Sequence, residues 1–171
     1  MGSKTLCMRK LIFALTIVSF LLSSAAYAPP TATASEIVTA RGRYFTEVPE
    51  TIISIEFVDG NVIATESHTL AITGDFSGTY PHIGRLVFRP DRTATFQASG
   101  TFTGTLFGVS GTLDIFLTGL ATGPNPGELS ILESRLVILR GTGGLANLHG
   151  EGIIEGTEDA GVYSFQVHFA A

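Results

Sequence analysis

The sequence is poor in cysteine and lysine. Its single cysteine, Cys7, and its two lysines, Lys4 and Lys10, all lie close to the start of the chain. Beyond residue 28 the sequence therefore offers no disulfide, no cysteine nucleophile and no cysteine-based metal site. In that part seven arginines stand against fifteen acidic residues, a net charge of −8. This excess of negative charge argues against nucleic acid or an anionic membrane as a partner.

The first 28 residues have the features of a secretory signal peptide. Lys4, Arg9 and Lys10 form a basic start, residues 11–22 are an apolar run, and Ala26-Tyr27-Ala28 is a small-residue cleavage site. The apolar run is about a dozen residues long, whereas a membrane-spanning helix needs about twenty. We expect a cleaved chain that is secreted or periplasmic and has no membrane span. An uncleaved anchor is the alternative.

The chain after the signal lacks any convincing helical pattern and alternates with a period of two. Residues 29–36, small and proline-bearing, predict a disordered mature terminus, and residues 37–171 predict a single domain. In Thr93 to Gly104, for example, Ala94, Phe96 and Phe102 share one face while threonines fill the other. Eight runs of this kind are present: Thr51 to Val58, Asn61 to Thr73, Ile83 to Phe88, Thr93 to Gly104, Val109 to Leu120, Leu129 to Arg140, Leu148 to Gly156 and Gly161 to Ala170.

Turn residues separate most of these runs, as they do in an antiparallel meander. The pattern indicates an all-β fold, either a barrel or a sandwich, and we favour the barrel because full closure removes exposed strand edges. The predicted turns are Asp59-Gly60-Asn61, Thr79-Tyr80-Pro81-His82, Pro90-Asp91, Thr122 to Gly127 and Glu158-Asp159-Ala160-Gly161.

Five glycines crowd into the twelve residues from Gly141 to Gly152. We interpret Gly141, Gly143 and Gly144 as a tight reversal that uses positive φ angles, with or without a single helical turn. Gly150 and Gly152 then lie within a strand, where they allow a bulky neighbour to approach. A phosphate-binding loop is the alternative, but such loops lead into a helix and this one leads into an alternating run.

Several of these segments resemble a family of mostly bacterial proteins of unknown function, which is similar to the barrel group of allene oxide cyclase and the plant dirigent proteins. The resemblance rests on Gly100 to Gly104, Gly108 to Leu113, Gly141 to Gly150 and Tyr163 to Phe169. It implies an eight-stranded antiparallel barrel with an apolar interior and, as in related barrels, a homo-oligomer. It implies no activity, and no cyclase catalytic residue maps onto this sequence.

Glu66 and His68 are the candidate catalytic residues. They share a face with Val62, Ala64 and Leu70, so a regular strand points them into the barrel. A buried carboxyl beside an imidazole can act as an acid/base pair. A bulge or the opposite register would place both in solvent.

Other polar residues carry less specific signals. Glu133 and Arg135 interrupt a strand that is apolar on both faces, so their direction and that of Arg85 stay open, and a structural ion pair is the simpler interpretation. His149, Glu151 and His168 are expected outside. The histidines have no metal-ligand spacing, and we expect no metal and no cofactor.

Three hypotheses for the function follow. The first is a barrel that binds a small apolar or amphipathic ligand, lined by Phe96, Phe102, Tyr163, Phe165 and Phe169. The second is an isomerase or cyclase that uses Glu66 and His68. The third is a structural or interaction protein of the cell envelope, which an exposed apolar patch would favour.

Overall fold

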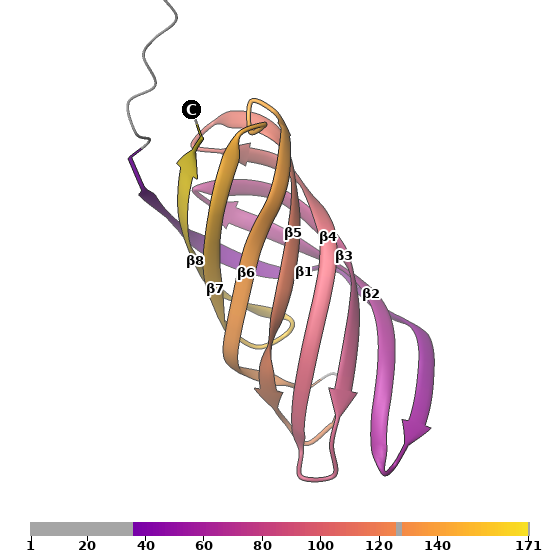
Figure 1. The fold of residues 1–171 in the computed structure, drawn as a ribbon. Helices are drawn as coiled ribbons and strands as arrows, with labels where there is room; N and C mark the ends of the chain where they lie inside the picture. Colours follow the sequence, from indigo (N-terminus) through magenta and orange to yellow (C-terminus); the bar gives the residue numbers. More distant parts are fainter. Residues whose placement is uncertain (1–35, 126–127, 171) are drawn as a thin grey trace, which may run out of the picture. The chain divides into compact units, whose positions relative to one another are not determined.

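The computed structural model describes residues 36–125 and 128–170, which form eight strands in a closed ring (Figure 1). Each strand pairs with its sequence neighbours in antiparallel fashion, and β8 pairs with β1 to close the ring. This confirms the all-β, eight-stranded antiparallel prediction. The predicted signal peptide, and the predicted spacer up to residue 35, lie outside the described residues. The strands are β1 Val38–Val58, β2 Asn61–Gly74, β3 Phe76–Phe88, β4 Thr93–Leu106, β5 Val109–Thr122, β6 Ser130–Gly143, β7 Leu148–Gly156 and β8 Ala160–Phe169.

The described residues contain no helix that is long and apolar enough to cross a membrane.

Two strands are longer than their patterns predicted. β1 begins at Val38, because its first residues pair with β8, and β3 begins at Phe76. The predicted turn at residues 79–82 is therefore wrong. Pro81 lies within β3 and pairs with Thr69 of β2, while the ladder to β4 has no recorded partner for it. Proline lacks an N–H and can keep only part of its pairing, which explains why the residue resembles a turn signal in the sequence.

The ring is irregular in two places. β1 carries three register shifts against β2, between residues 46 and 54, so it holds more residues than the partner segment. Between β6 and β7 only Leu136 with Gly152 and Val137 with Glu151 pair directly. Next to them, the Ser134 hydroxyl accepts a hydrogen bond from the Ile154 N–H (2.7 Å) and donates one to the Ile154 carbonyl (2.8 Å). A side chain thus replaces part of the ladder.

The glycine-rich loop between β6 and β7 shapes the path of the backbone. Gly143 has a φ of 61°, whereas Gly141 and Gly144 do not adopt the expected positive φ. Gly141 lies within β6, and residues 144–147 form turns without a helix. The N–H groups of Gly144 and Leu145 donate to backbone carbonyls, at 2.9 and 3.1 Å. These donors are therefore already used within the fold. In β7, a side chain on Gly152 would lie 2.7 Å from the ring of Phe165, so glycine is needed there for close packing.

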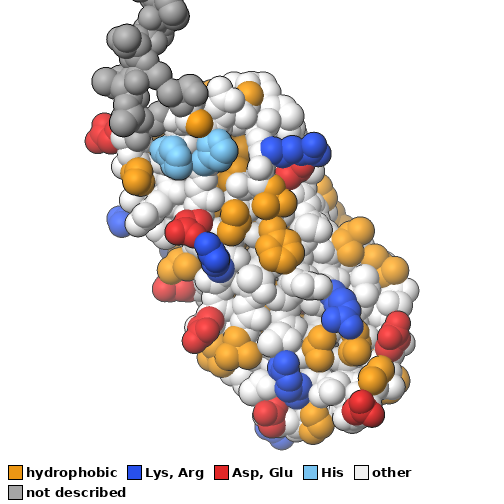
Figure 2. Space-filling model, viewed as in Figure 1, with side chains coloured by type: hydrophobic (Ala, Val, Ile, Leu, Met, Phe, Trp, Pro, Cys, Tyr) orange, Lys and Arg blue, Asp and Glu red, His pale blue; other side chains and the backbone are white. Residues whose placement is uncertain are grey.

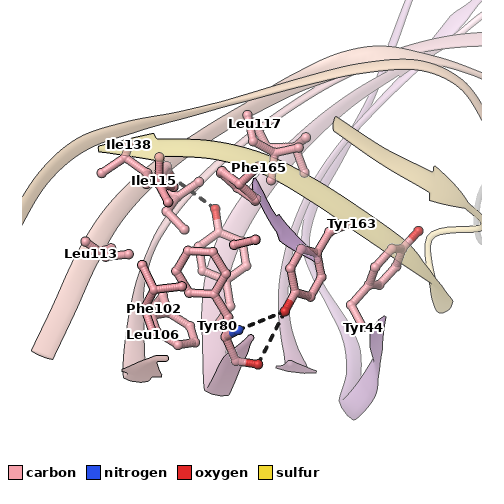
Figure 3. Close-up of a cluster of buried hydrophobic side chains, with 14 of the residues drawn as sticks. Tyr44, Tyr80, Phe102, Leu106, Leu113, Ile115, Leu117, Ile138, Tyr163 and Phe165 are labelled. Carbon is pink, nitrogen blue, oxygen red and sulfur yellow. Dashed lines mark hydrogen bonds between the residues drawn. The ribbon is translucent and has the colours of Figure 1, made fainter. Parts of the chain in front are cut away.

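Most of the interior is a large apolar cluster, which we define as the buried residues around Phe76, Phe102 and Phe165 (Figure 3). The three rings meet edge to face, with the Phe76 centroid 5.5 Å from each of the other two. The Tyr163 hydroxyl accepts a hydrogen bond from the Phe76 N–H at 2.9 Å and donates one to the Thr73 carbonyl at 3.1 Å. Leu145 of the glycine-rich loop is fully buried in the same cluster.

A second, small apolar cluster lies further along the strands and contains Ala64, Leu86, Ala94, Ala121 and Leu129. On β2 the two polar residues Glu66 and His68 stand between Ala64 of this small cluster and Leu70 of the large one. The interior thus consists of two apolar regions with polar side chains between them.

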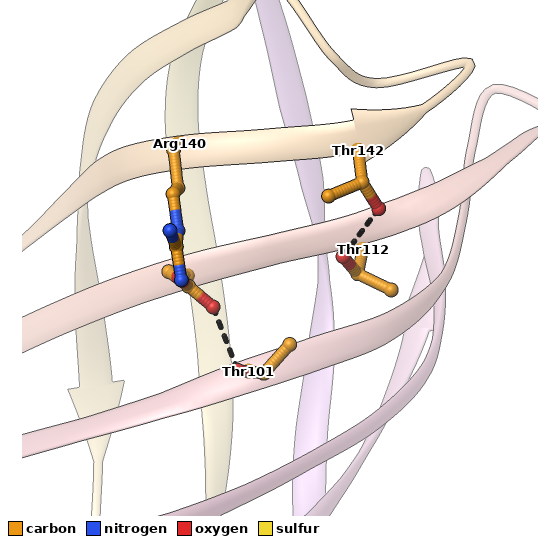
Figure 4. Close-up of polar contacts among 5 residues, drawn as sticks. Thr101, Thr112, Arg140 and Thr142 are labelled. Carbon is orange, nitrogen blue, oxygen red and sulfur yellow. Dashed lines mark hydrogen bonds and ion pairs between the residues drawn. The ribbon is translucent and has the colours of Figure 1, made fainter.

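The outer face is held by short polar contacts across strands. Arg140 of β6 pairs with Asp114 of β5, which accepts a hydrogen bond from Thr101 of β4 at 2.7 Å (Figure 4). The hydroxyls of Thr112 and Thr142 lie 2.7 Å apart (Figure 4). Apolar side chains are scattered among the charges on the face shown in Figure 2.

Candidate functional site

Glu66 and His68 point into the ring, as the alternation of β2 predicted. His68 is 7% exposed and is the one buried polar or charged residue among those that the structure describes. Glu66 is half-buried. The backbone hydrogen bonds of β2 to β1 and β3 fix the register, with Glu66 opposite Gly84 and His68 opposite His82. Because Gly84 has no side chain, room remains in front of the Glu66 carboxyl.

That room is a cavity of about 70 Å³, which we call the polar cavity. A neighbouring cavity of about 50 Å³, inside the large apolar cluster, shares four of its lining residues. The shared residues are Tyr44, Leu70, Leu117 and Ile154. An engineered protein cavity of about 150 Å³ holds one benzene molecule, so each of these spaces admits only a few atoms.

Glu66 and Glu158 line the polar cavity, and the exposed Glu50 lies close to both carboxyls. Glu66 belongs to β2, Glu50 to the irregular part of β1, and Glu158 to the turn between β7 and β8, whose backbone N–H bonds to the Leu129 carbonyl at 3.3 Å. Burial, reinforced by the charge of Glu50, raises the pKa of Glu66 to about 7. Burial and the neighbouring carboxylates raise the pKa of Glu158 to about 8. In the described part of the chain, neither Glu66 nor Glu158 belongs to a salt bridge.

A hydrogen-bonded chain sets the tautomer of His68. The Thr46 hydroxyl donates to the Asp159 carboxylate at 2.8 Å and lies 3.0 Å from His68 Nε2. A hydroxyl has one proton, so Nε2 of the imidazole must carry the hydrogen and donate it to Thr46. Burial lowers the pKa of His68, although Asp159 and Glu50 oppose this effect. The neutral ring then keeps Nδ1 as a free base.

His82 of β3 completes the polar group. Its ring stacks on Tyr80 with centroids 4.8 Å apart, and lies 5.4 Å from the ring of His68. Its Nδ1 lies 3.2 Å from the Tyr80 carbonyl, which requires a proton on Nδ1. Burial lowers the pKa of His82 to about 4, so this imidazole is neutral at pH 7. At that pH Glu66 is about half protonated and Glu158 is mostly protonated, and both lie beside neutral imidazoles.

A depression of about 360 Å³ is bordered by Val48, Pro49 and residues of β2, β3 and β4. His68 and His82 line both this depression and the polar cavity. The two histidines thus lie between the two spaces, next to the irregular segment of β1.

Of the aromatic residues predicted to line the interior, all but Phe169 line one of the two cavities. Phe102, Tyr163 and Phe165 line the apolar cavity, and Phe96 lines the polar one. Phe169 does not belong to either lining and is 40% exposed. Alternation gave it the same face as Phe165, but it is the last residue of β8 and lies beyond the buried part of the ring.

The structure shows which way the other charged residues face. Glu133, Arg135 and Arg85 are all exposed. Arg135 pairs with Glu151 of β7 at 2.9 Å, so the structural ion pair exists with a different acid from Glu133.

His149 and His168 lie towards the outside, where their rings stack with centroids 5.7 Å apart. Figure 2 shows two histidine side chains together at the surface. The described residues contain no group of three or more histidine, cysteine, aspartate or glutamate side chains placed to hold a metal ion.

Sequence reasoning missed Glu50, His82 and Glu158. Alternation could have placed His82 inside if β3 had been extended past Pro81. The alternation of polar and apolar residues could not have placed Glu50 or Glu158 at the site, because Glu50 lies in a bulged segment and Glu158 lies in a turn.

No protein-family model and no curated protein matches this chain. Among solved structures it is similar to a protein of unknown function from the DUF3224 family of Shewanella oneidensis MR-1, with 17% identity and a TM-score of 0.61, over 80% of this chain and 99% of that one. A protein of unknown function from Clostridium acetobutylicum ATCC 824 matches with 13% identity, a TM-score of 0.49 and coverage of 80% and 99%. A β-barrel-like protein from Acinetobacter baumannii AYE matches with 10% identity, a TM-score of 0.48 and coverage of 83% and 99%. The first likeness shows a shared uncharacterised β-barrel fold.

Proposed function

We propose that this protein binds a small amphipathic molecule in the polar cavity. The observation that carries the proposal is a hollow beside Glu66 that is lined by carboxyls on one side and by Phe96 and Leu117 on the other. Protonated carboxyls and neutral imidazoles can donate and accept hydrogen bonds, while the apolar wall favours a hydrocarbon part.

The size of the cavities narrows the ligand class. About 70 Å³, with about 50 Å³ next to it, is less than the cavity that holds benzene and suits a molecule of only a few heavy atoms. This size argues against a long lipid or the extended unsaturated substrate of a cyclase.

The test is titration with isopropanol, a small amphipathic alcohol, followed by NMR. We expect saturable shifts around His68 at concentrations up to about 10 mM. Gly84→Ala should abolish them, because the added methyl group would lie 3.4 Å from Glu66 Oε1, an ordinary contact that fills the cavity without strain. Ser99→Ala, an exposed change on β4, is the control. Isopropanol binding that is absent, or unchanged in Gly84→Ala, would contradict the proposal.

A second candidate function is proton-transfer isomerisation. It is favoured by a carboxyl with a pKa of about 7 in the same cavity as the neutral His68, since such a pair can give and take protons near neutral pH. The test is exchange of the methyl protons of acetone in D₂O. Exchange that Glu66→Gln does not slow would refute this function.

We also propose that the protein is exported and that the resemblance to the allene oxide cyclase and dirigent barrels reflects a common architecture. Support for export comes from the signal features of residues 1–28, and support for the architecture from the eight-stranded closed ring. Protein collected outside the cytoplasm should begin at Pro29. N-terminal sequencing that starts at Met1 or Met8 would contradict cleavage.

A further inference from the structure

The second half of β1 leaves the ring and has a free edge. β8 pairs with β1 only from Val38 to Phe45, and the Thr46 N–H makes one more hydrogen bond, to the Asp159 carbonyl. Residues 47–58 pair with β2 on one side, and no other strand in the described part of the chain pairs with their second side. Figure 1 shows this part of the β1–β2 hairpin with no strand beyond it. Its outward N–H and C=O groups are therefore available to another strand.

The side chains along this edge are unusually apolar for exposed residues. Phe57 is 80% exposed and Ile55 is 52% exposed, and four more large apolar side chains of this segment are exposed as well. Natural edge strands are commonly protected by lysines or repeated charges. Here Glu47 and Glu50 lie at the start of the free edge, and Glu56 is the only charged residue from Thr51 to Val58. The further apolar residues are Val48, Ile52, Ile53 and Val58.

We propose that a second copy of this chain pairs with the free edge, antiparallel, about a two-fold axis at Ile55. This inference is independent of the proposed ligand. In that register Ile55 faces Ile55 of the other copy, and Ser54 faces Glu56, which can accept a hydrogen bond from the serine hydroxyl. The flanking pairs bring Phe57 to Ile53 and Val58 to Ile52. From Ile52 to Val58 every apolar side chain then meets an apolar one, and no like charges are opposed.

The neighbouring symmetric registers fit less well. A two-fold axis perpendicular to the sheet places one residue opposite its own copy, so the alternatives are centred on Ser54 or Glu56. Centring on Glu56 opposes two carboxylates, and centring on Ser54 places Ile52 against Glu56. The sequence of residues 52–58 is thus complementary to a second copy of itself, and it favours the register centred on Ile55.

The experiment is light scattering of the purified protein during size exclusion. A single strand pair is a small interface, so we expect a mass that rises to twice the monomer value at about 100 µM. Ile55→Lys should restore the monomer at the same concentration. Ile83→Lys is the matched control, because Ile83 is 56% exposed but lies on β3, which has neighbours on both sides. It should remain dimeric.

A crosslinking variant tests the register independently of the charge change. In a Cys7→Ser background, Ile55→Cys should form a disulfide-linked dimer, since directly opposite Cβ atoms lie about 4.5–5.5 Å apart. Ile83→Cys should not. A wild-type monomer throughout, an Ile55→Lys dimer, or equal crosslinking of the two cysteine variants would each overturn the proposal.

Discussion

The large apolar cluster and the polar cavity lie along the same strands but differ in how their side chains are packed and paired. In the cluster, Phe76, Phe102 and Phe165 interlock. Its three tyrosine hydroxyls, those of Tyr44, Tyr80 and Tyr163, all have hydrogen-bond partners. The polar cavity is lined by the carboxyls of Glu66 and Glu158, with Glu50 close to both, and none of the salt bridges in the described residues includes Glu66 or Glu158.

The comparison separates the region that stabilises the fold from the region whose polar groups can bind or react. A satisfied apolar cluster is stabilised by burial and packing alone. Unpaired buried carboxyls oppose folding when they ionise, because the charged form loses its hydration. Such groups persist beside a cavity, where a bound molecule can satisfy them, and this is the physical case for placing the site there.

The largest effect should come from the cluster. Phe102→Ala removes a ring that is 1% exposed and is expected to lower the free energy of unfolding by about 3 to 5 kcal/mol through the cavity it leaves. Denaturant unfolding gives the value. Thr103→Ala, the next residue on β4 and an exposed one, should change it by less than about 0.5 kcal/mol. Similar losses in the two variants would mean that the interior of this region is not tightly packed.

A smaller loss is expected at the loop that closes the cluster. Gly143→Val places a β-branched residue at a φ of 61° and should lower the free energy of unfolding by about 1 to 3 kcal/mol. The loss should be the same with and without phosphate. A phosphate-dependent rise in the wild-type melting temperature that disappears in the variant would instead indicate an anion-binding loop.

The sequence predicted the parts of the fold that depend on alternation. The faces of β2 and β4 were predicted correctly, so Glu66, His68 and Phe102 were placed inside before any coordinates. Alternation fails where the ladder is irregular or where a strand ends. Pro81 suggests a turn in the sequence, although β3 runs through it. Phe169 is on the inward-facing side of β8, but it is the last residue of the strand and none of the described residues covers it fully.

The site was predictable only in part, for the same reason. Two of its members lie on a regular strand, but Glu50 depends on the bulges of β1 and Glu158 on a turn. Their convergence with Glu66 follows from closure of the ring, which brings residues 50, 66 and 158 together although more than 90 positions separate the last two. A pattern within one segment contains no information about such a meeting.

The smallest predicted effect is the dependence of stability on pH, and it tests the polar cavity directly. The pKa of Glu66 in the folded protein, about 7, lies above its ordinary value of 4.5. The folded state therefore binds the proton more tightly, and the stability that this provides is complete below pH 4.5 and is lost as the pH rises through 7. Glu158 acts in the same direction through about pH 8. His82, with a lowered pKa of about 4, is already neutral in this range and contributes no change.

We therefore expect the free energy of unfolding to fall between pH 6 and pH 9, and Glu66→Gln to reduce that fall by on the order of 1 kcal/mol, since water screens the exposed part of the carboxyl. Urea unfolding at both pH values measures it. Glu151→Gln is the matched control: this carboxylate lies outside and pairs with Arg135, so its loss should leave the fall unchanged and should cost under about 0.5 kcal/mol. If the Glu66 and Glu151 variants retain the same pH dependence as the wild type, Glu66 is not a buried acid and the contrast between the two regions fails.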